Sequence, residues 1–221
     1  QIELRLIAEL SQEDNMIEAF LQNKDIHAIT ASKVFKVHLE EVTSEMRSNA
    51  KTVNFGIIYG VSAFGLSEQS TLSRKESALL IEEYFKTYPR LKLYIDNQIL
   101  LANKNGYVKS ILGRKRYLRN INSRNSFVRS HDERNAVNMP IQGSAADIIK
   151  LAMIRINQEF INRNLKSKMV LQVHDELVFD VYLPEKNIVR EIVQENMENA
   201  YDSKVPLKVE IGFGRNWLEA H

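Results

Sequence analysis

The spacing of apolar residues changes for the rest of the chain near residue 162, and this change limits the possible folds more than any other feature. Before it, apolar residues recur every three or four positions, as on helices, apart from a β-type stretch at 107–118. After it, the pattern predicts strands at 168–174, 176–183 and 207–212 and a helix at 186–201. Helices followed by a small antiparallel sheet indicate an α+β fold, in which a mostly helical subdomain is inserted before the sheet closes.

The helical part of the sequence contains start and stop signals. Candidate N-caps, whose side chains accept hydrogen bonds from the first turn of a helix, are Ser11, Asp25, Thr43 and Ser73. Pro89 should interrupt the helical stretch that follows Ser73, Gly106 should end it, and Pro140 should kink a later helix at 127–162. Because only eight Gly and four Pro occur in 221 residues, we expect no flexible interdomain linker.

The composition is that of an ordinary globular protein. A 44% hydrophobic content over 221 residues is enough for one large domain or two modest ones. Cysteine is absent, which excludes disulfides and thiolate metal sites, so a bound metal must use carboxylates or histidine. No transmembrane stretch or signal peptide is visible, and we expect no membrane partner. The first residue is Gln1 within an apolar run, so we expect the chain to be cut from a longer protein.

Charge is distributed unevenly along the chain. Residues 104–134 contain nine Lys and Arg against two acids, a net charge of +7, whereas the whole chain carries +2 and the remainder therefore −5. A basic segment on an acidic body suggests a polyanionic partner that contacts one region. The alternative is a solvated charged face with no partner.

The stretch RSNAKTVNFGIIYG at 47–60 places two cations before two aromatic rings. Arg47, Lys51, Phe55 and Tyr59 recur every four residues and would share one face of a helix. Such a face could hold phosphates at one end and offer rings to a base at the other, so it suits a nucleotide. The alternative is an amphipathic helix whose rings are in the core and whose cations are solvated.

A second polar face lies in ERNAVNMPIQGSAADIIK, at 133–150. Arg134, Asn138 and Gln142 are again four residues apart, and together they could line a groove that reads sugar and base edges. The spacing is equally consistent with a capped, solvent-exposed junction between two helical segments. His27, near the start of another predicted helix, is by position alone more typical of a surface or core histidine.

The stretch VLQVHDELVFDV at 170–181 predicts two strands around a charged tip, His174, Asp175 and Glu176. The tip is either a hairpin turn in water or part of a metal site. Two-metal catalysis needs several carboxylates around ions about 3.5–4 Å apart. Neighbours in a regular strand point to opposite faces, so at least one further carboxylate would have to come from another strand.

Three stretches, in this order, resemble the polymerase domain of family A DNA polymerases, the bacterial DNA polymerase I group. QIELR at 1–5 is similar to the end of the first family motif, D-Y-S-Q-I-E-L-R. RSNAKTVNFGIIYG matches the second motif, R-x-x-x-K-x-x-N-F-G-x-x-Y-G, and VHDE at 173–176 matches the third. The likeness covers essentially the whole chain and implies a cytoplasmic bacterial protein associated with the nucleoid.

The resemblance implies a role for each residue of the nucleotide site. Arg47, Lys51 and His27 would hold the triphosphate of the incoming deoxynucleotide, and Lys51 would also donate a proton to the leaving pyrophosphate. Phe55 would pack on the sugar and Tyr59 near the template base. A further residue, Glu3, would act as the steric gate against a ribose 2′-hydroxyl.

The resemblance also implies contacts with primer-template DNA. Arg134 and Gln142 would touch the minor groove of the duplex, Asn138 would line the same site, and His174 would lie near the primer terminus. Asp175 would be the metal-binding aspartate and Glu176 its accessory neighbour. In the implied reaction the primer 3′-hydroxyl attacks the α-phosphate of a deoxynucleoside triphosphate, with two Mg²⁺ ions present.

The resemblance divides the chain into the start of a palm at 1–10, fingers at 11–142 and most of the palm at 143–221. The first-motif aspartate and the thumb are not in the sequence, so we expect residues 1–221 alone to be inactive or severely impaired. Two alternatives remain for the function. One is a non-catalytic DNA-binding module that uses the basic segment, and the other is a metal-dependent nuclease that uses Asp175.

Overall fold

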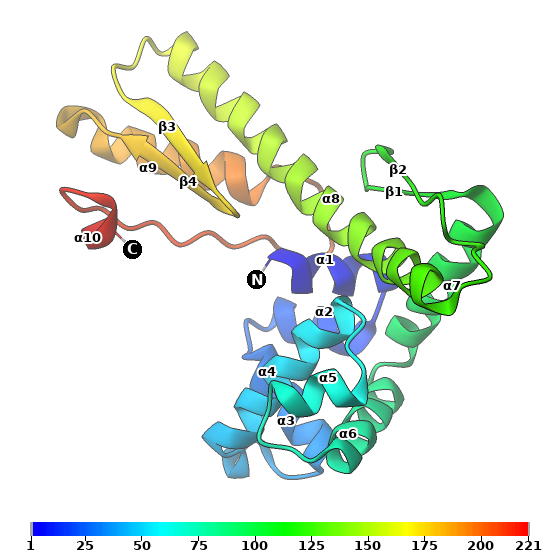
Figure 1. Ribbon diagram of the computed structural model, residues 1–221. Helices are drawn as coiled ribbons and strands as arrows, with labels where there is room; N and C mark the ends of the chain where they lie inside the picture. Colours follow the sequence, from blue (N-terminus) through cyan, green and yellow to red (C-terminus); the bar gives the residue numbers. More distant parts are fainter. Residues whose placement is uncertain (1, 221) are drawn as a thin grey trace. The chain divides into compact units, whose positions relative to one another are not determined.

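The computed structural model describes residues 2–220, which form two compact units, 3–144 and, together with Ile2, 145–220 (Figure 1). Helices predominate, and the strands within this range make two antiparallel sheets of two strands each. The predicted α+β fold is therefore confirmed. No helix within 2–220 combines the length and the apolar character needed to cross a bilayer.

The first unit begins with short helices, whose starts the sequence predicts only in part. Their bounds are α1 Ile2–Ser11, α2 Asp14–Leu21, α3 Ile26–Phe35 and the 3-10 helix η1 Leu39–Glu41. Asp25 caps α3, because its carboxylate accepts from the backbone N–H groups of His27 and Ala28. The prediction that Ser11 is a cap is wrong. Ser11 ends α1, its hydroxyl donates back to a carbonyl of that helix at 2.6 Å, and Glu13 has the N-cap position of α2.

Predicted caps and breaks define three of the next four helices. Their bounds are α4 Ser44–Ile58, α5 Ala63–Glu68, α6 Arg74–Thr87 and α7 Pro89–Asn105. Thr43 and Ser73 cap α4 and α6 through their side chains. Pro89 is the first residue of α7, where its missing N–H is no loss. Gly106 ends α7 at φ +72°, a left-handed conformation that glycine adopts without strain.

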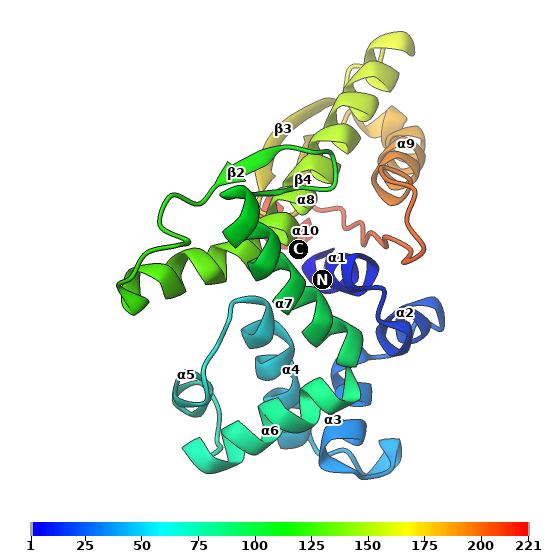
Figure 2. The same ribbon diagram turned by 90° about the vertical axis from the view of Figure 1, so that its right-hand side faces the viewer.

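Helix α3 packs on α4 and α6, an arrangement visible in Figure 1 and, from the side, in Figure 2. Most buried side chains of these helices are apolar, including Ala31, Val34, Ala50, Val53, Ile57, Leu80 and Tyr84. Burial of apolar surface stabilises a fold by about 25 cal/mol per Å². This core therefore fixes one face of α4 and leaves the other toward solvent.

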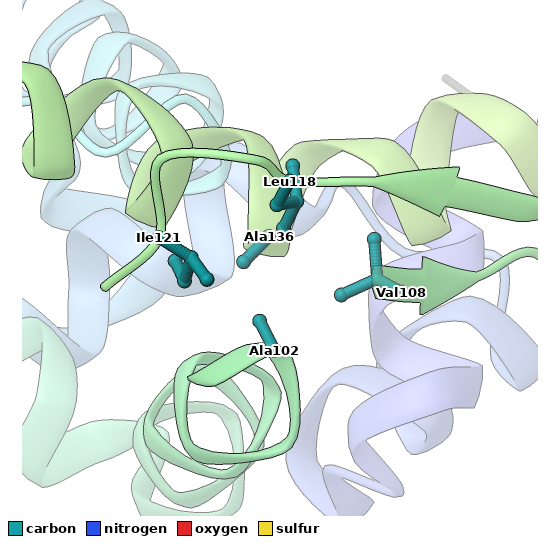
Figure 3. Packing of buried hydrophobic residues seen from close by; sticks show 5 residues of the cluster. All are labelled: Ala102, Val108, Leu118, Ile121 and Ala136. Carbon is teal, nitrogen blue, oxygen red and sulfur yellow. The ribbon is translucent and has the colours of Figure 1, made fainter. Parts of the chain in front are cut away.

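The β-type stretch of the basic segment forms a hairpin. Strand β1 (Tyr107–Lys109) pairs with β2 (Lys115–Tyr117) in antiparallel register. Figure 3 shows the apolar cluster that anchors it on α7 and on the long helix α8 (Ser126–Asn162). The labelled side chains are Ala102, Val108, Leu118, Ile121 and Ala136.

Polar contacts also tie the hairpin to α8. The Arg114 guanidinium donates to the carbonyl of Gly143 at 2.8 Å, and the Ile111 N–H donates to the Ser144 hydroxyl at 2.8 Å. Arg114 is thus engaged in holding the segment in place. The neighbouring Lys115–Tyr117 strand is exposed along its length.

The second unit contains the end of α8 and a second hairpin. Its other elements are β3 Lys168–Val173, β4 Glu176–Asp180, η2 Leu183–Glu185, α9 Lys186–Glu198 and α10 Trp217–Ala220. The strands pair antiparallel, with an irregularity between Met169 and Leu171. Phe160 of α8 meets Phe179 of β4 at 5.9 Å between ring centroids, and both ribbon views show the hairpin beside α8 (Figure 1, Figure 2).

The predicted strand at 207–212 is wrong. Among the described residues β3 pairs only with β4, and 207–212 joins no sheet. Alternating apolar residues do not make a strand without the hydrogen bonds of a partner strand. The β3 strand is also less buried than its sequence suggests, since Val170 is 58% exposed and Leu171 47%.

Candidate functional site

The solvent-facing side of α4 carries the residues that the sequence singles out. They are Arg47, Lys51, Phe55 and, directly after the helix, Tyr59. The two cations are exposed, the phenylalanine is partly buried and Tyr59 is 41% exposed. The alternative of a helix with both rings in the core is therefore wrong for Tyr59. Four side chains suited to a nucleotide lie along one accessible face.

Arg47 is held by the cap of the neighbouring helix. Its Nε donates to Asp25 Oδ2 at 2.7 Å, while the same carboxylate caps α3. Burial opposes the ionisation of Asp25, but the hydrogen bonds from Arg47, Ala28 and His27 outweigh it and lower the pKa of Asp25. One carboxylate therefore fixes both the start of α3 and the guanidinium on α4.

Asp25→Asn is expected to cost a small amount of stability at pH 7 and nothing in strong acid. Asparagine caps a helix about as well as aspartate, so the substitution removes mainly the charge. Because folding lowers the pKa of Asp25, its contribution is present above the unfolded value of about 3.9 and is lost as pH falls through the folded value. Urea unfolding of both chains at pH 7 and pH 3 measures this. A difference that is equal at the two pH values would contradict the assignment.

His27 lies at the junction of α3 and α4. It is 9% exposed, its ring centroid is 5.8 Å from that of Phe55, and its Nδ1 is 3.0 Å from the amide nitrogen of Asn54. Burial lowers the pKa of His27; the charge of Asp25 opposes this, and those of Arg47 and Lys51 lower it further. The ring therefore belongs to the same cluster as the α4 cations.

Tyr59 joins α4 to α1. Its hydroxyl donates to Glu3 Oε2 at 2.7 Å. Burial raises the pKa of Tyr59, the hydrogen bond to the Glu3 carboxylate raises it further, and a side-chain hydrogen bond with Gln142 acts in the opposite direction. Glu3, Tyr59 and Gln142, which the sequence singles out in separate stretches, thus meet at the end of α4.

Arg134 of α8 packs beside the turn that follows α4. A Cβ added to Gly60 would lie 2.8 Å from Arg134 Cγ, and Gly60 has φ +68°. On the same helix, Asn138 Oδ1 is buried and has no hydrogen-bond partner among the described residues. Glycine at position 60 therefore serves both the left-handed turn and the close approach of Arg134.

Gly60→Ala is expected to destabilise the chain by about 1–2 kcal/mol and to displace Arg134, because alanine is strained in the left-handed region. Gly106→Ala is a matched control: its φ is +72°, but nothing lies within 4 Å of the added Cβ. Both variants should lose stability in urea unfolding, and Gly60→Ala should lose more because only its Cβ meets Arg134. Only Gly60→Ala should also shift the NMR signals of Arg134, and unchanged Arg134 signals in that variant would contradict the close approach.

The charged tip of the second unit is a two-residue turn, His174 and Asp175, between β3 and β4. His174 has φ +52°, which is uncommon for a non-glycine residue. The side-chain amide of Gln172 donates to the backbone carbonyl of His174 at 3.1 Å. Glu176 begins β4 opposite Val173. Because Asp175 lies in the turn, the alternation of a regular strand does not force it to the face opposite Glu176.

Asp175 and Glu176 suit a divalent cation that prefers oxygen. Mg²⁺ in phosphoryl-transfer sites is commonly held by one or two carboxylates together with phosphates of the substrate. Within residues 2–220, no group of three or more His, Asp or Glu side chains is gathered as a metal site. As two neighbouring carboxylates, the pair fits a site whose remaining ligands come from a bound substrate and water.

The structure brings most of the singled-out residues of 3–144 into contact with one another or with the ends of α4. His174, Asp175 and Glu176 belong to the other unit. Sequence reasoning missed two residues of the cluster: Asp25, identified only as a cap, and Asn54. Asn54 could have been found from the sequence, because it is a polar residue on the apolar side of α4. A buried amide needs a hydrogen-bond partner, which indicates a polar contact at that position.

Comparison with known proteins gives consistent matches over the whole chain. The sequence profile of DNA polymerase family A matches residues 1–219. The DNA polymerase I of Caldicellulosiruptor bescii is 52% identical over 219 residues, covering 99% of this chain and 26% of that protein. That of Bacillus caldotenax is 48% identical over 220 residues, covering 100% and 25%.

A solved structure matches equally well. The POL domain of Pol1 from M. smegmatis, in complex with DNA primer-template and dNTP, has a TM-score of 0.95 and 44% identity, covering 100% of this chain and 39% of that one. The chain spans about a quarter of the length of the curated relatives it matches.

Proposed function

We propose that this chain, which belongs to DNA polymerase family A, is the part of a longer protein that adds template-directed deoxynucleotides to a primer 3′-hydroxyl. The observation that carries the proposal is the solvent-facing side of α4, with Arg47, Lys51, Phe55 and Tyr59 in a row. Since the chain spans about a quarter of its relatives, the activity is proposed for the longer protein and not for residues 1–221 by themselves.

Arg47, Lys51 and His27 bind the triphosphate in this proposal. Two exposed cations four residues apart can hold adjacent phosphates through charge-assisted hydrogen bonds. The primer 3′-hydroxyl loses its proton to solvent as its oxygen bonds to the α-phosphate, and Lys51 donates a proton to the pyrophosphate as the bond between the pyrophosphate and the α-phosphate breaks. Arg47 can keep its Nε bond to Asp25, because the two NH₂ groups of its guanidinium remain as donors to a phosphate.

Phe55 and Tyr59 bind the sugar and the template-base side of the nucleotide. Phe55 offers a partly buried ring, and the Tyr59 hydroxyl donates to the Glu3 carboxylate and so fixes it at the end of α4. A carboxylate fixed in this way can exclude a ribose 2′-hydroxyl by steric contact. We therefore propose Glu3 as the determinant of selection for deoxyribose.

Arg134, Asn138 and Gln142 face the minor groove of the duplex in this proposal, and His174 faces the primer terminus. The unpaired, buried Asn138 Oδ1 supports a further ligand on this side of α8. The Pol1 structure from M. smegmatis contains both a primer-template and a dNTP, which supports these partners for the present chain.

Asp175 would hold Mg²⁺ together with the substrate phosphates, with Glu176 as its accessory neighbour. The bound ions would activate the primer hydroxyl and stabilise the charge that develops on the triphosphate. The proposed organisation is a palm that begins at 1–10, fingers at 11–142 and most of the palm at 143–221. We propose that the longer protein works on DNA in the bacterial cytoplasm, at the nucleoid.

Primer extension by the longer protein tests the proposal. With Mg²⁺, one labelled primer and four templates that differ in the next base, we expect only the complementary deoxynucleotide to be added. Shortening of the primer without addition would instead support the metal-dependent nuclease. Binding of DNA without any response to nucleotides would support a DNA-binding module based on 104–134.

A further inference from the structure

A chain of hydrogen-bonded polar side chains runs through the buried space between α3, α4 and the start of α7. Its members are His27, Thr30, Asn54 and Tyr88. The last three are completely buried. Because buried polar groups in native proteins are almost always paired, the position of each proton along this chain can be worked out.

Thr30 sets the direction of the chain. Its hydroxyl is 2.7 Å from the carbonyl oxygen of Ile26, which can only accept, so the single hydroxyl proton is used there. The Thr30 oxygen is also 2.9 Å from the Tyr88 hydroxyl and 3.2 Å from the Asn54 amide nitrogen. It must accept from both. The contact of Thr30 with Asn54 Oδ1 would need the same proton and is longer, at 3.3 Å.

Asn54 therefore turns its NH₂ group toward Thr30, and its second N–H reaches His27. Nδ1 of His27 lies 3.0 Å from this nitrogen and must accept. A neutral imidazole whose Nδ1 accepts carries its proton on Nε2. Burial lowers the pKa of His27, with Asp25 opposing and the Arg47 and Lys51 charges adding to the effect, so the ring is neutral at neutral pH.

The other ring nitrogen of His27 is open to a ligand. Nε2 has no hydrogen-bond partner within residues 2–220. It is also absent from the unpaired side-chain atoms of that range that are fully shielded from solvent, so part of its surface is accessible. A protonated Nε2 offers a donor to a phosphate oxygen, whereas the other tautomer would turn a lone pair toward it. The choice of tautomer thus decides whether His27 attracts or repels a phosphate.

We propose that Asn54 is a positioning residue that holds His27 as the Nε2–H tautomer, so that His27 donates a hydrogen bond to the triphosphate of the nucleotide. This inference rests on the proposed function, because it takes a triphosphate as the ligand of His27. Asn54 itself touches no substrate and acts only through the histidine.

The tautomer can be measured directly on the 221-residue chain. Long-range ¹H–¹⁵N spectra of the histidine side chains distinguish the two neutral forms, and His27→Gln assigns the His27 signal among the five histidines. We expect a protonated Nε2 and a bare Nδ1. An Nδ1–H tautomer in the unsubstituted chain would overturn the inference, whatever the variants do.

Asn54→Asp replaces the donor by an acceptor of the same shape. The proton of His27 should then be found on Nδ1. Tyr88→Phe is the matched control, because it removes a buried hydroxyl from the far end of the same chain and leaves the donor to Nδ1 in place. If Asn54→Asp leaves the His27 signals unchanged, the inference is wrong.

Titration with Mg·dATP connects the tautomer with binding. Asn54→Asp should bind about tenfold or more weakly, the effect of losing a hydrogen bond to a charged group, and Tyr88→Phe should bind as the unsubstituted chain does. If Lys51→Ala weakens binding and Asn54→Asp does not, the inference fails and the proposed function stands. If neither substitution changes the binding of Mg·dATP, both fail.

Discussion

Replacing Asp175 by asparagine is expected to slow primer extension by the longer protein about a thousandfold or more at saturating nucleotide. The amide keeps the size of the side chain but loses its negative charge, and a hard dication binds neutral amide oxygen less well than carboxylate. Metal stabilisation of the transition state amounts to several kcal/mol, and each 1.36 kcal/mol changes the rate about tenfold. Single-turnover extension with rapid mixing measures the chemical step.

Asp180→Asn is the matched control for this substitution. Asp180 lies at the other end of the same hairpin, opposite Lys168, and is exposed. A surface substitution of this kind should change the rate by no more than about twofold. If Asp175→Asn slows extension as little as Asp180→Asn does, Asp175 does not hold the catalytic metal.

Lys51→Ala is expected to lower kcat/KM for the incoming deoxynucleotide about 10- to 100-fold. A hydrogen bond to a charged group contributes about 1.5–3 kcal/mol, and the triphosphate would lose one such partner. The two proposed roles of Lys51 separate in the kinetic constants. A role in binding raises KM, whereas a role as proton donor lowers kcat.

Lys86→Ala is a suitable control, because Lys86 is an exposed cation of α6 that already bonds to Glu82 at 2.8 Å and Glu83 at 2.9 Å. Its removal should leave kcat/KM within about twofold of the unsubstituted protein. Equal constants for Lys51→Ala and Lys86→Ala would mean that the triphosphate binds elsewhere.

The sequence predicts helix ends well where the signal is local. Thr43 and Ser73 cap helices through groups only three residues away, and Gly106 ends α7 through its own backbone. Ser11 fails because a serine hydroxyl can bond either forward as a cap or back to its own helix, and here it bonds back. The strand at 207–212 fails because a strand depends on a distant partner that alternation does not reveal.

The same distinction applies to the candidate site. Helix geometry alone puts Arg47, Lys51 and Phe55 on one face, so their spacing is enough to predict it. The contacts that orient them cross from α3 to α4: Arg47 meets Asp25 across 22 residues and Asn54 meets His27 across 27. Such tertiary contacts follow from packing and have no spacing rule in the sequence.

Binding of a nucleotide to the solvent-facing side of α4 can be followed by NMR of the ¹⁵N-labelled 221-residue chain during addition of Mg·dNTP. We expect saturable shifts at Arg47, Lys51, Phe55 and Tyr59 and at the start of α3, with the β1–β2 hairpin unchanged. Shifts confined to 107–117, with α4 unaffected, would contradict this binding and identify the basic segment as the site that binds polyanions.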